Sequence, residues 1–168
     1  MVKIKILGMD QATHNTGFSV FDGNSLVDYG INTVEKNEDS TERINLMKKF
    51  LKKLIDKHAP DIVVLENTQL QYIFNPKTKS STVIAPDDFR LLSKLLGVME
   101  DYCFENEICF VTIFSTEWKS KCKIKGRKRE EQKLNAIAFI EKQFGIEVSS
   151  DIADAICIGW WGVKKYIN

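Results

Sequence analysis

Apolar residues are distributed along the chain in two patterns. Short runs that are apolar at nearly every position are typical of strands buried inside a sheet. Longer stretches, in which apolar residues recur every three or four positions, are typical of helices packed on one face. The turn signal Asp22-Gly23 joins the second and third strands into a hairpin. Strands are predicted over residues 3–10, 17–21, 26–34, 61–66 and 108–114.

The helices have recognisable boundaries. Asp39-Ser40-Thr41-Glu42 is typical of a capping box, and His58-Ala59-Pro60 ends the helix that follows it. Ser149 or Ser150 is expected to cap the final helix. Between these, helices are predicted over residues 86–105, 116–121 and 128–144, the last with Leu134, Ile137, Ala138 and Phe144 facing inward. Residues 67–85 are predicted to form a long polar loop.

Three antiparallel strands followed by alternating helices and strands predict one α/β domain spanning residues 1–168. A chain of 168 residues, 43% of them hydrophobic, is long enough for one complete core. No stretch approaches 18 consecutive apolar residues, so no membrane span is expected. Cys103, Cys109 and Cys157 lie in apolar runs and are expected to be reduced core residues of a cytoplasmic protein. Two histidines are too few for a histidine-based zinc site.

Four acidic residues stand where strands and a helix meet solvent. Asp10 ends the first strand, and Glu66 ends the strand predicted over 61–66. Asp151 and Asp154 lie three residues apart at the start of the last helix, on one helix face. Four neighbouring carboxylates repel one another unless cations compensate their charge. Their hard oxygen ligands suit Mg²⁺ or Mn²⁺.

Basic residues are concentrated in one segment. The whole chain has a net charge of +1, whereas Lys119 to Lys133 holds eight basic and two acidic residues. A basic segment on an otherwise mildly acidic chain favours an oriented contact with a polyanion. The same segment also fits a solvated charged face.

The order of these elements resembles the ribonuclease H-like fold, with a five-stranded mixed sheet flanked by helices. Within that fold, the sequence resembles the RuvC family of Holliday junction resolvases over essentially the whole chain. A longer loop after Glu66, and the absence of glycine between Asp10 and Thr13, favour a phage-encoded branch. The matching segments are Leu7-Gly8-Met9-Asp10 with Gly17, Val64-Leu65-Glu66, Leu96-Gly97-Val98, Gly126-Arg127-Lys128-Arg129-Glu130-Glu131-Gln132 and Asp151-Ile152-Ala153-Asp154-Ala155.

The resemblance implies hydrolysis of phosphodiester bonds with two Mg²⁺ ions per site, for which Mn²⁺ would substitute. It implies that Asp10 bridges the two ions, that Glu66 and Asp154 each complete one site, and that Asp151 supports them. It further implies a homodimer that resolves four-way junctions by paired nicks. The alternatives are a nuclease for forks and three-way junctions, or a junction-binding protein with weak catalysis.

Two segments are candidates for DNA contact. Tyr72 and Phe74, in the predicted loop, are expected to stack on unpaired bases or to anchor the loop on the body. Either Lys119 or Lys125 is expected to reach the scissile phosphate. Phosphate contacts are predicted for Lys119, Lys121, Lys123, Lys125, Arg127, Lys128 and Arg129.

The helix over 86–105 carries two apolar stripes. Leu92, Leu95, Leu96, Met99 and Cys103 suffice to cover a sheet. A second stripe, formed by Leu91, Val98 and Tyr102, is predicted to form a dimer interface, unless the chain's own C-terminal helices bury it.

Three other function classes fit the sequence less well. An actin-like kinase needs a second lobe for which the chain is too short, and a binding protein without catalysis would not need all four acids. A ribonuclease H shares the fold, but the basic segment and the second apolar stripe favour a resolvase.

Overall fold

A computed structural model describes residues 3–12, 14–35 and 39–167. Its first three strands, β1 (Lys5–Asp10), β2 (Asn15–Asp22) and β3 (Ser25–Thr33), form an antiparallel meander. Gly23 has a positive φ of 60° in the β2–β3 turn, where a glycine costs little. The predicted hairpin at Asp22-Gly23 is therefore confirmed.

Two parallel strands complete the main sheet. β4 (Ile62–Glu66) pairs with β1 and with β7 (Cys109–Ile113), so that the strand order is β3-β2-β1-β4-β7. β4 is buried from Ile62 to Leu65, as expected of a central strand. The predicted five-stranded mixed sheet is confirmed.

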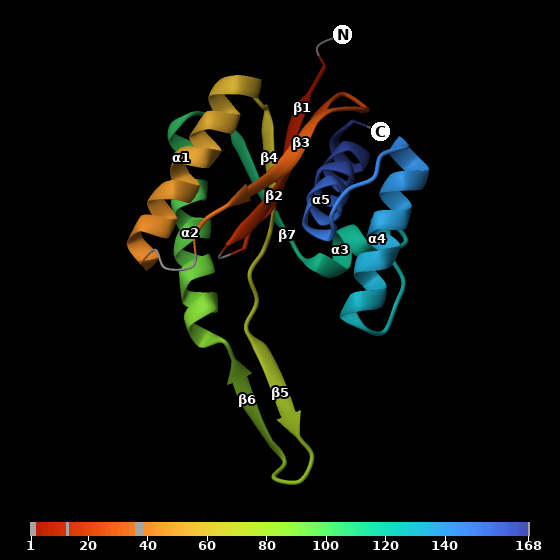
Figure 1. Cartoon of the computed structure of the whole chain (residues 1–168). Helices are drawn as coiled ribbons and strands as arrows, with labels where there is room; N and C mark the ends of the chain where they lie inside the picture. Colours follow the sequence, from red (N-terminus) through yellow and green to blue (C-terminus); the bar gives the residue numbers. More distant parts are fainter. Residues whose placement is uncertain (1–2, 13, 36–38, 168) are drawn as a thin grey trace.

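Helices cover both faces of this sheet (Figure 1). On one face lie α1 (Ser40–His58) and α2 (Pro86–Glu105), which pack on each other. On the other lie α3 (Ser115–Lys121), α4 (Arg129–Phe144) and α5 (Ser150–Tyr166). Each face has its own buried cluster of apolar side chains. None of the helices in the described ranges is long and apolar enough to cross a membrane.

α5 lies unusually close to the sheet because small residues line the contact. A Cβ atom at Gly8 would overlap the backbone of Gly159, and one at Gly17 would overlap the carbonyl of Asp151. The hydroxyl of Ser19 donates a hydrogen bond of 2.8 Å to the carbonyl of Ala155. This close packing sets the height of the first turn of α5 above the ends of β1 and β2.

The sequence predicted a long loop over residues 67–85, but the structure shows that part of this segment forms strands. The segment contains a hairpin of β5 (Gln71–Asn75) and β6 (Ser80–Ile84), which projects away from the body of the domain (Figure 1). Tyr72 pairs with Val83, and Phe74 pairs with Ser81. The side chains described along both strands are exposed, so no buried face produced the alternating pattern that reveals most strands.

Three other sequence-based predictions need correction. Leu134 is 67% exposed and Ala138 is exposed, because α4 turns a different face to α5, with Ala136 and Ile140 buried. Cys109 is a free thiol but is exposed, since β7 is an edge strand. Ser149 is the N-cap residue of the last helix, as predicted, although its side chain makes no capping hydrogen bond.

The two stripes of α2 are also assigned differently in the structure. Leu91 is only 8% exposed and belongs to the buried stripe with Leu95, Met99 and Cys103. Tyr102 packs toward α1, where the ammonium group of Lys48 lies 5.8 Å from its ring centre. The prediction that Leu91 and Tyr102 form a free face is wrong. Leu91 and Leu95 are four positions apart and differ by only about 40° around the helix, so the sequence alone does not separate the two stripes.

Candidate active site

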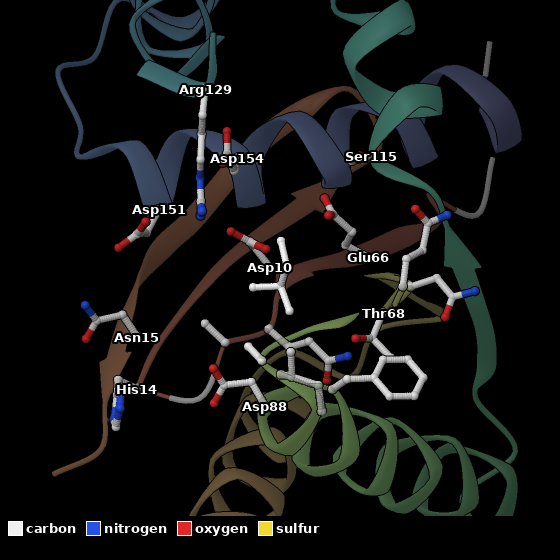
Figure 2. Close-up of a pocket in the computed structure, with 18 of the residues that line it drawn as sticks. Asp10, His14, Asn15, Glu66, Thr68, Asp88, Ser115, Arg129, Asp151 and Asp154 are labelled. Carbon is white, nitrogen blue, oxygen red and sulfur yellow. The ribbon is translucent and has the colours of Figure 1, made fainter. Parts of the chain in front are cut away.

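The four predicted carboxylates line one pocket of about 570 Å³ at the ends of β1 and β4. Asp10 and Glu66 are the last residues of these neighbouring parallel strands. Asp151 and Asp154 lie near the start of α5 (Figure 2). Three segments that are far apart in the sequence therefore place their acids in one site.

The acids share a face of the sheet for a simple reason. Side chains alternate along a strand, so Ile6 and Val64 face α5, while Leu7, Met9, Val63 and Leu65 face α1 and α2. Asp10 and Glu66 continue the side of Ile6 and Val64, beneath α5. The same alternation turns the residues that follow the acids toward α2.

Burial disfavours the charged forms of three of these acids, and repulsion by the other acids adds to its effect on Asp10 and Asp154. Burial, followed by the charges of Glu66, Asp154 and Asp151, raises the pKa of Asp10 well above its usual value. Burial and the charge of Glu66 raise the pKa of Asp154 to about 6, against the opposing effects of Lys119 and Lys133. Burial also raises the pKa of Glu66. The pocket thus carries negative charge that the described side chains compensate only in part.

The donor set fits a hard divalent cation. Carboxylate oxygens are the ligands that Mg²⁺ and Mn²⁺ prefer, and a cation would relieve the repulsion that raises these pKa values. Within residues 3–12, 14–35 and 39–167, no three acidic, histidine or cysteine side chains already converge into a closed metal site. The four acids line the same pocket, and their carboxylates would have to move closer together to bind an ion.

Glu66 has a partner that the sequence did not reveal. The indole Nε1 of Trp118, on α3, donates a hydrogen bond of 2.6 Å to Oε2 of Glu66. Trp118 is buried in the core, and it also fixes a carboxylate of the site. The hydrogen bond lowers the pKa of Glu66, against the larger effect of burial that raises it.

Two cations of α4 enter the pocket itself. Arg129 and Lys133 line it, and Figure 2 shows the Arg129 side chain extending from α4 toward Asp10, Asp151 and Asp154. Lys119 lies close enough to lower the pKa values of Glu66 and Asp154. Lys125, the alternative to Lys119 at the scissile phosphate, does not line the pocket. Of the basic residues predicted to contact DNA, only Arg129 lines it.

The remaining predicted DNA contacts lie outside the pocket. Tyr72 and Phe74 are 58% and 61% exposed on the projecting hairpin, which joins the pocket wall at Ile84 and Ala85. Exposed side chains surround the start of α4, namely Lys121, Lys123, Lys125, Arg127 and Lys128.

The side of the pocket toward α2 is mostly uncharged. Gln11, Asn67 and Thr68 line it together with the apolar side chains of Phe89 and Leu92. His14 also lines the pocket. Sequence patterns gave no sign of Gln11, Asn67 or Thr68, because these residues follow the acids at strand ends. Leu92 was assigned by its periodicity to the stripe that covers the sheet.

A mixed sheet in this strand order, with acids on β1, β4 and the last helix, is the ribonuclease H-like fold. T. thermophilus RuvC, solved in complex with a Holliday junction substrate, superposes with a TM-score of 0.71 at 14% identity, covering 94% of this chain and 92% of that chain. The yeast mitochondrial Holliday junction resolvase superposes with a TM-score of 0.57 at 16% identity, covering 99% of this chain and 82% of that chain.

Sequence comparison leads to the same proteins. The crossover junction endodeoxyribonucleases RuvC of Fusobacterium nucleatum and Dictyoglomus turgidum are each 26% identical to the chain. The first match covers 92% of this chain and 77% of the relative, and the second covers 91% and 92%. No protein-family model matches the chain. The predicted resemblance to RuvC is confirmed, while phage origin stays a prediction.

Proposed function

We propose that the chain is a metal-dependent endonuclease that cuts branched DNA and resolves four-way junctions by paired hydrolytic nicks. The observation that carries this proposal is the meeting of Asp10, Glu66, Asp151 and Asp154 in one pocket that Arg129 and Lys133 also line. Carboxylates that hold cations, beside side chains that hold phosphate, are what phosphodiester hydrolysis requires. The RuvC relatives support junction DNA as the substrate.

The four acids would together hold two Mg²⁺ ions, for which Mn²⁺ would substitute. Asp10, whose charge interacts with those of the other three acids, would contribute to holding both ions. Glu66 and Asp154 would each complete one site, and Asp151 would support them from the first turn of α5. Bound in this way, the ions would activate the attacking water and stabilise the leaving 3′ oxygen.

The chain's own cations would hold the scissile phosphate. Arg129 and Lys133 reach the pocket from α4, and Lys119 stands beside Glu66 and Asp154. Their positive charges are placed to bind phosphate oxygens next to the carboxylates. The exposed basic residues before α4 would continue this contact along a DNA arm, while Trp118 keeps Glu66 in one orientation.

The projecting hairpin would enter the open centre of a branched substrate. Tyr72 and Phe74 lie on the same face of β5, since they are two residues apart, and both are exposed. Aromatic side chains stack on unpaired bases, which a junction or fork offers and a plain duplex does not.

The working unit would be a two-fold symmetric dimer formed through α2. Phe104 is 81% exposed, and the space around Gly97, seven residues earlier on the same face, is open. Of the predicted interface residues, Val98 is partly buried, whereas Leu91 packs within the chain and Tyr102 lies toward α1. A second copy suits the two-fold symmetry of a four-way junction.

Cleavage assays on four substrates test the proposal. A mobile four-way junction, a fork, a linear duplex and an RNA–DNA hybrid are incubated with Mg²⁺ and the wild-type protein or Asp10→Asn. Paired symmetric nicks in the junction, absent with Asp10→Asn, are expected. Equal cutting of the fork and the four-way junction would favour a general debranching nuclease. Junction binding without cleavage by the wild type would indicate a binding protein, and cutting of the hybrid alone would indicate a ribonuclease H.

A further inference from the structure

One buried side chain in the pocket has no polar partner. Gln11 follows Asp10 directly and is only 8% exposed. Within the described part of the chain, neither its amide nitrogen nor its amide oxygen makes a hydrogen bond. Buried amides are almost always paired, because an amide removed from water without a partner is unfavourable. Gln11 therefore holds hydrogen-bonding capacity that the free protein does not use.

Uncharged side chains line the pocket together with Gln11. They include the Asn67 amide and the apolar side chains of Phe89 and Leu92 on α2. Asp88, also on α2, lines the pocket and is exposed. A phosphate would bind beside Arg129 and Lys133 instead. An amide next to apolar walls suits a flat, uncharged group that carries both donors and acceptors.

We propose that Gln11 and its neighbours form a subsite for one unstacked nucleobase next to the scissile phosphate, with the Gln11 amide reading its edge. A glutamine amide offers two donors and an acceptor, the pattern that pairs with the N6 and N7 atoms of adenine. Phe89 and Leu92 provide the apolar surface against which the base would lie. This inference rests on the proposed function, because it places the base beside the cleaved bond.

The amide must turn to reach a base. Its two polar atoms are shielded in the free protein, so a bound nucleobase would draw the side chain into the open part of the pocket. The subsite would then give the nuclease a sequence preference at one nucleotide beside the cut. The free protein would be less stable than a variant with an apolar side chain of the same length at this position.

Two measurements on Gln11→Met test the subsite, with Gln143→Met as the matched control on the exposed surface of α4. In the first, both variants and the wild type cut a pool of four-way junctions with randomised nucleotides around the branch point. The wild type is expected to favour one base at a single position beside the cut. Gln11→Met should reduce that preference by roughly tenfold, while Gln143→Met keeps it.

Thermal unfolding of the free protein provides the second measurement. Gln11→Met should raise the melting temperature by about 2–4 °C, since the unpaired amide is removed. An unchanged or lowered melting temperature would mean that the amide is already satisfied, and it would overturn the subsite. So would an unaltered base preference, or an equal loss of cleavage on every sequence, which would indicate a backbone contact. If Gln11→Met fails to fold, Gln11→Leu replaces it in both measurements.

A binding selection separates this inference from the proposed function. The same pool is bound by Asp10→Asn and by Asp10→Asn with Gln11→Met, so that cleavage does not consume the DNA. If the wild type cuts no junction, the proposed function fails, but enrichment of one base that depends on Gln11 would still support the subsite. A bound pool without such enrichment, or no binding at all, would overturn it.

Discussion

Trp118 and Glu66 are 52 residues apart in the sequence and are joined by a hydrogen bond of 2.6 Å from the indole Nε1 to the carboxylate Oε2. The bond occupies one oxygen of Glu66 and leaves the other free for an ion. Because Trp118 is buried in the core beneath α5, the indole itself is held firmly. The structure thus fixes the orientation of one carboxylate before any cation binds.

The first prediction tests this orientation with Trp118→Phe, which keeps the aromatic packing and removes the N–H donor. A lost hydrogen bond to a charged group weakens the site by about 1.5–3 kcal/mol, so half-maximal cleavage should need roughly tenfold more Mg²⁺. Titrating cleavage against Mg²⁺ measures this shift. The control is Trp160→Phe, which lies in the same core and packs against the rings of Phe21 and Phe144. Equal Mg²⁺ requirements for both variants would assign Trp118 to packing alone.

A second prediction concerns pH. Asp154 has a pKa of about 6 in the folded protein against 3.8 for a free aspartate, so the folded state binds its proton more tightly. Without metal, the stability that Asp154 contributes should therefore be fully present below pH 4 and should be lost as the pH rises from 4 to 6. Asp154→Asn should be about 1–3 kcal/mol more stable than the wild type at pH 7, and the difference should vanish below pH 4.

Urea unfolding in EDTA across this pH range measures the effect. Added Mg²⁺ at pH 7 should stabilise the wild type, while Asp154→Asn should gain less and should cut junctions far more slowly. Equal stabilisation of both proteins by Mg²⁺ would remove Asp154 from the set of ligands.

A third prediction separates cations of the pocket from those around it. Arg129→Gln with Lys133→Gln should slow cleavage by at least tenfold at saturating DNA, since these side chains line the pocket of the acids. Lys123→Gln, Lys125→Gln and Arg127→Gln together should instead weaken binding. They should reduce the slope of log affinity against log salt by about 0.9 for each lost phosphate contact. An unchanged slope would place these three residues away from DNA.

A fourth prediction addresses the hairpin. Tyr72→Ala with Phe74→Ala should reduce junction cleavage several-fold and leave duplex affinity nearly unchanged, because stacking needs unpaired bases. Ile73→Ala with Thr82→Ala is the matched control, since this cross-strand pair lies on the opposite face of the hairpin. Equal losses for the two double variants would show that the hairpin acts through its shape alone.

The fifth prediction concerns assembly. Gly97→Glu with Phe104→Glu should give a folded monomer that nicks junctions without pairing the two cuts, because charge on both residues would block a second copy of α2. Light scattering gives the mass, and Leu134→Glu, on the exposed face of α4, should remain dimeric. A wild-type monomer that still makes paired nicks would refute the dimer.

Local patterns predicted the sheet and the four acids. Asp10 and Glu66 end uniformly apolar runs, and the carboxyl ends of adjacent parallel strands lie at one edge of a sheet. Asp151 and Asp154 share a helix face by spacing alone. These features depend on residues close together in the sequence, where strand and helix periodicity leave little freedom.

The missed features depend on distant contacts or on the absence of a core. The Trp118–Glu66 bond and the arrival of Arg129 and Lys133 follow from how α3 and α4 pack, which no short segment specifies. The β5–β6 hairpin has no buried face, so it lacks the alternation that marks other strands. Leu91 was misplaced because a small rotation of α2 exchanges neighbouring stripes.

The close packing of α5 on β1 has a consequence for synthesis of the chain. Gly8 and Gly17 leave room for α5 against the sheet. α5 is the last of the described elements along the chain, so the ribosome synthesises it after the others. Until that helix emerges and docks, a growing chain carries Asp10 and Glu66 without Asp151 and Asp154. A half-made or C-terminally shortened protein would therefore lack an intact set of ligands, and the proposed cleavage of branched DNA would begin only once the fold is finished.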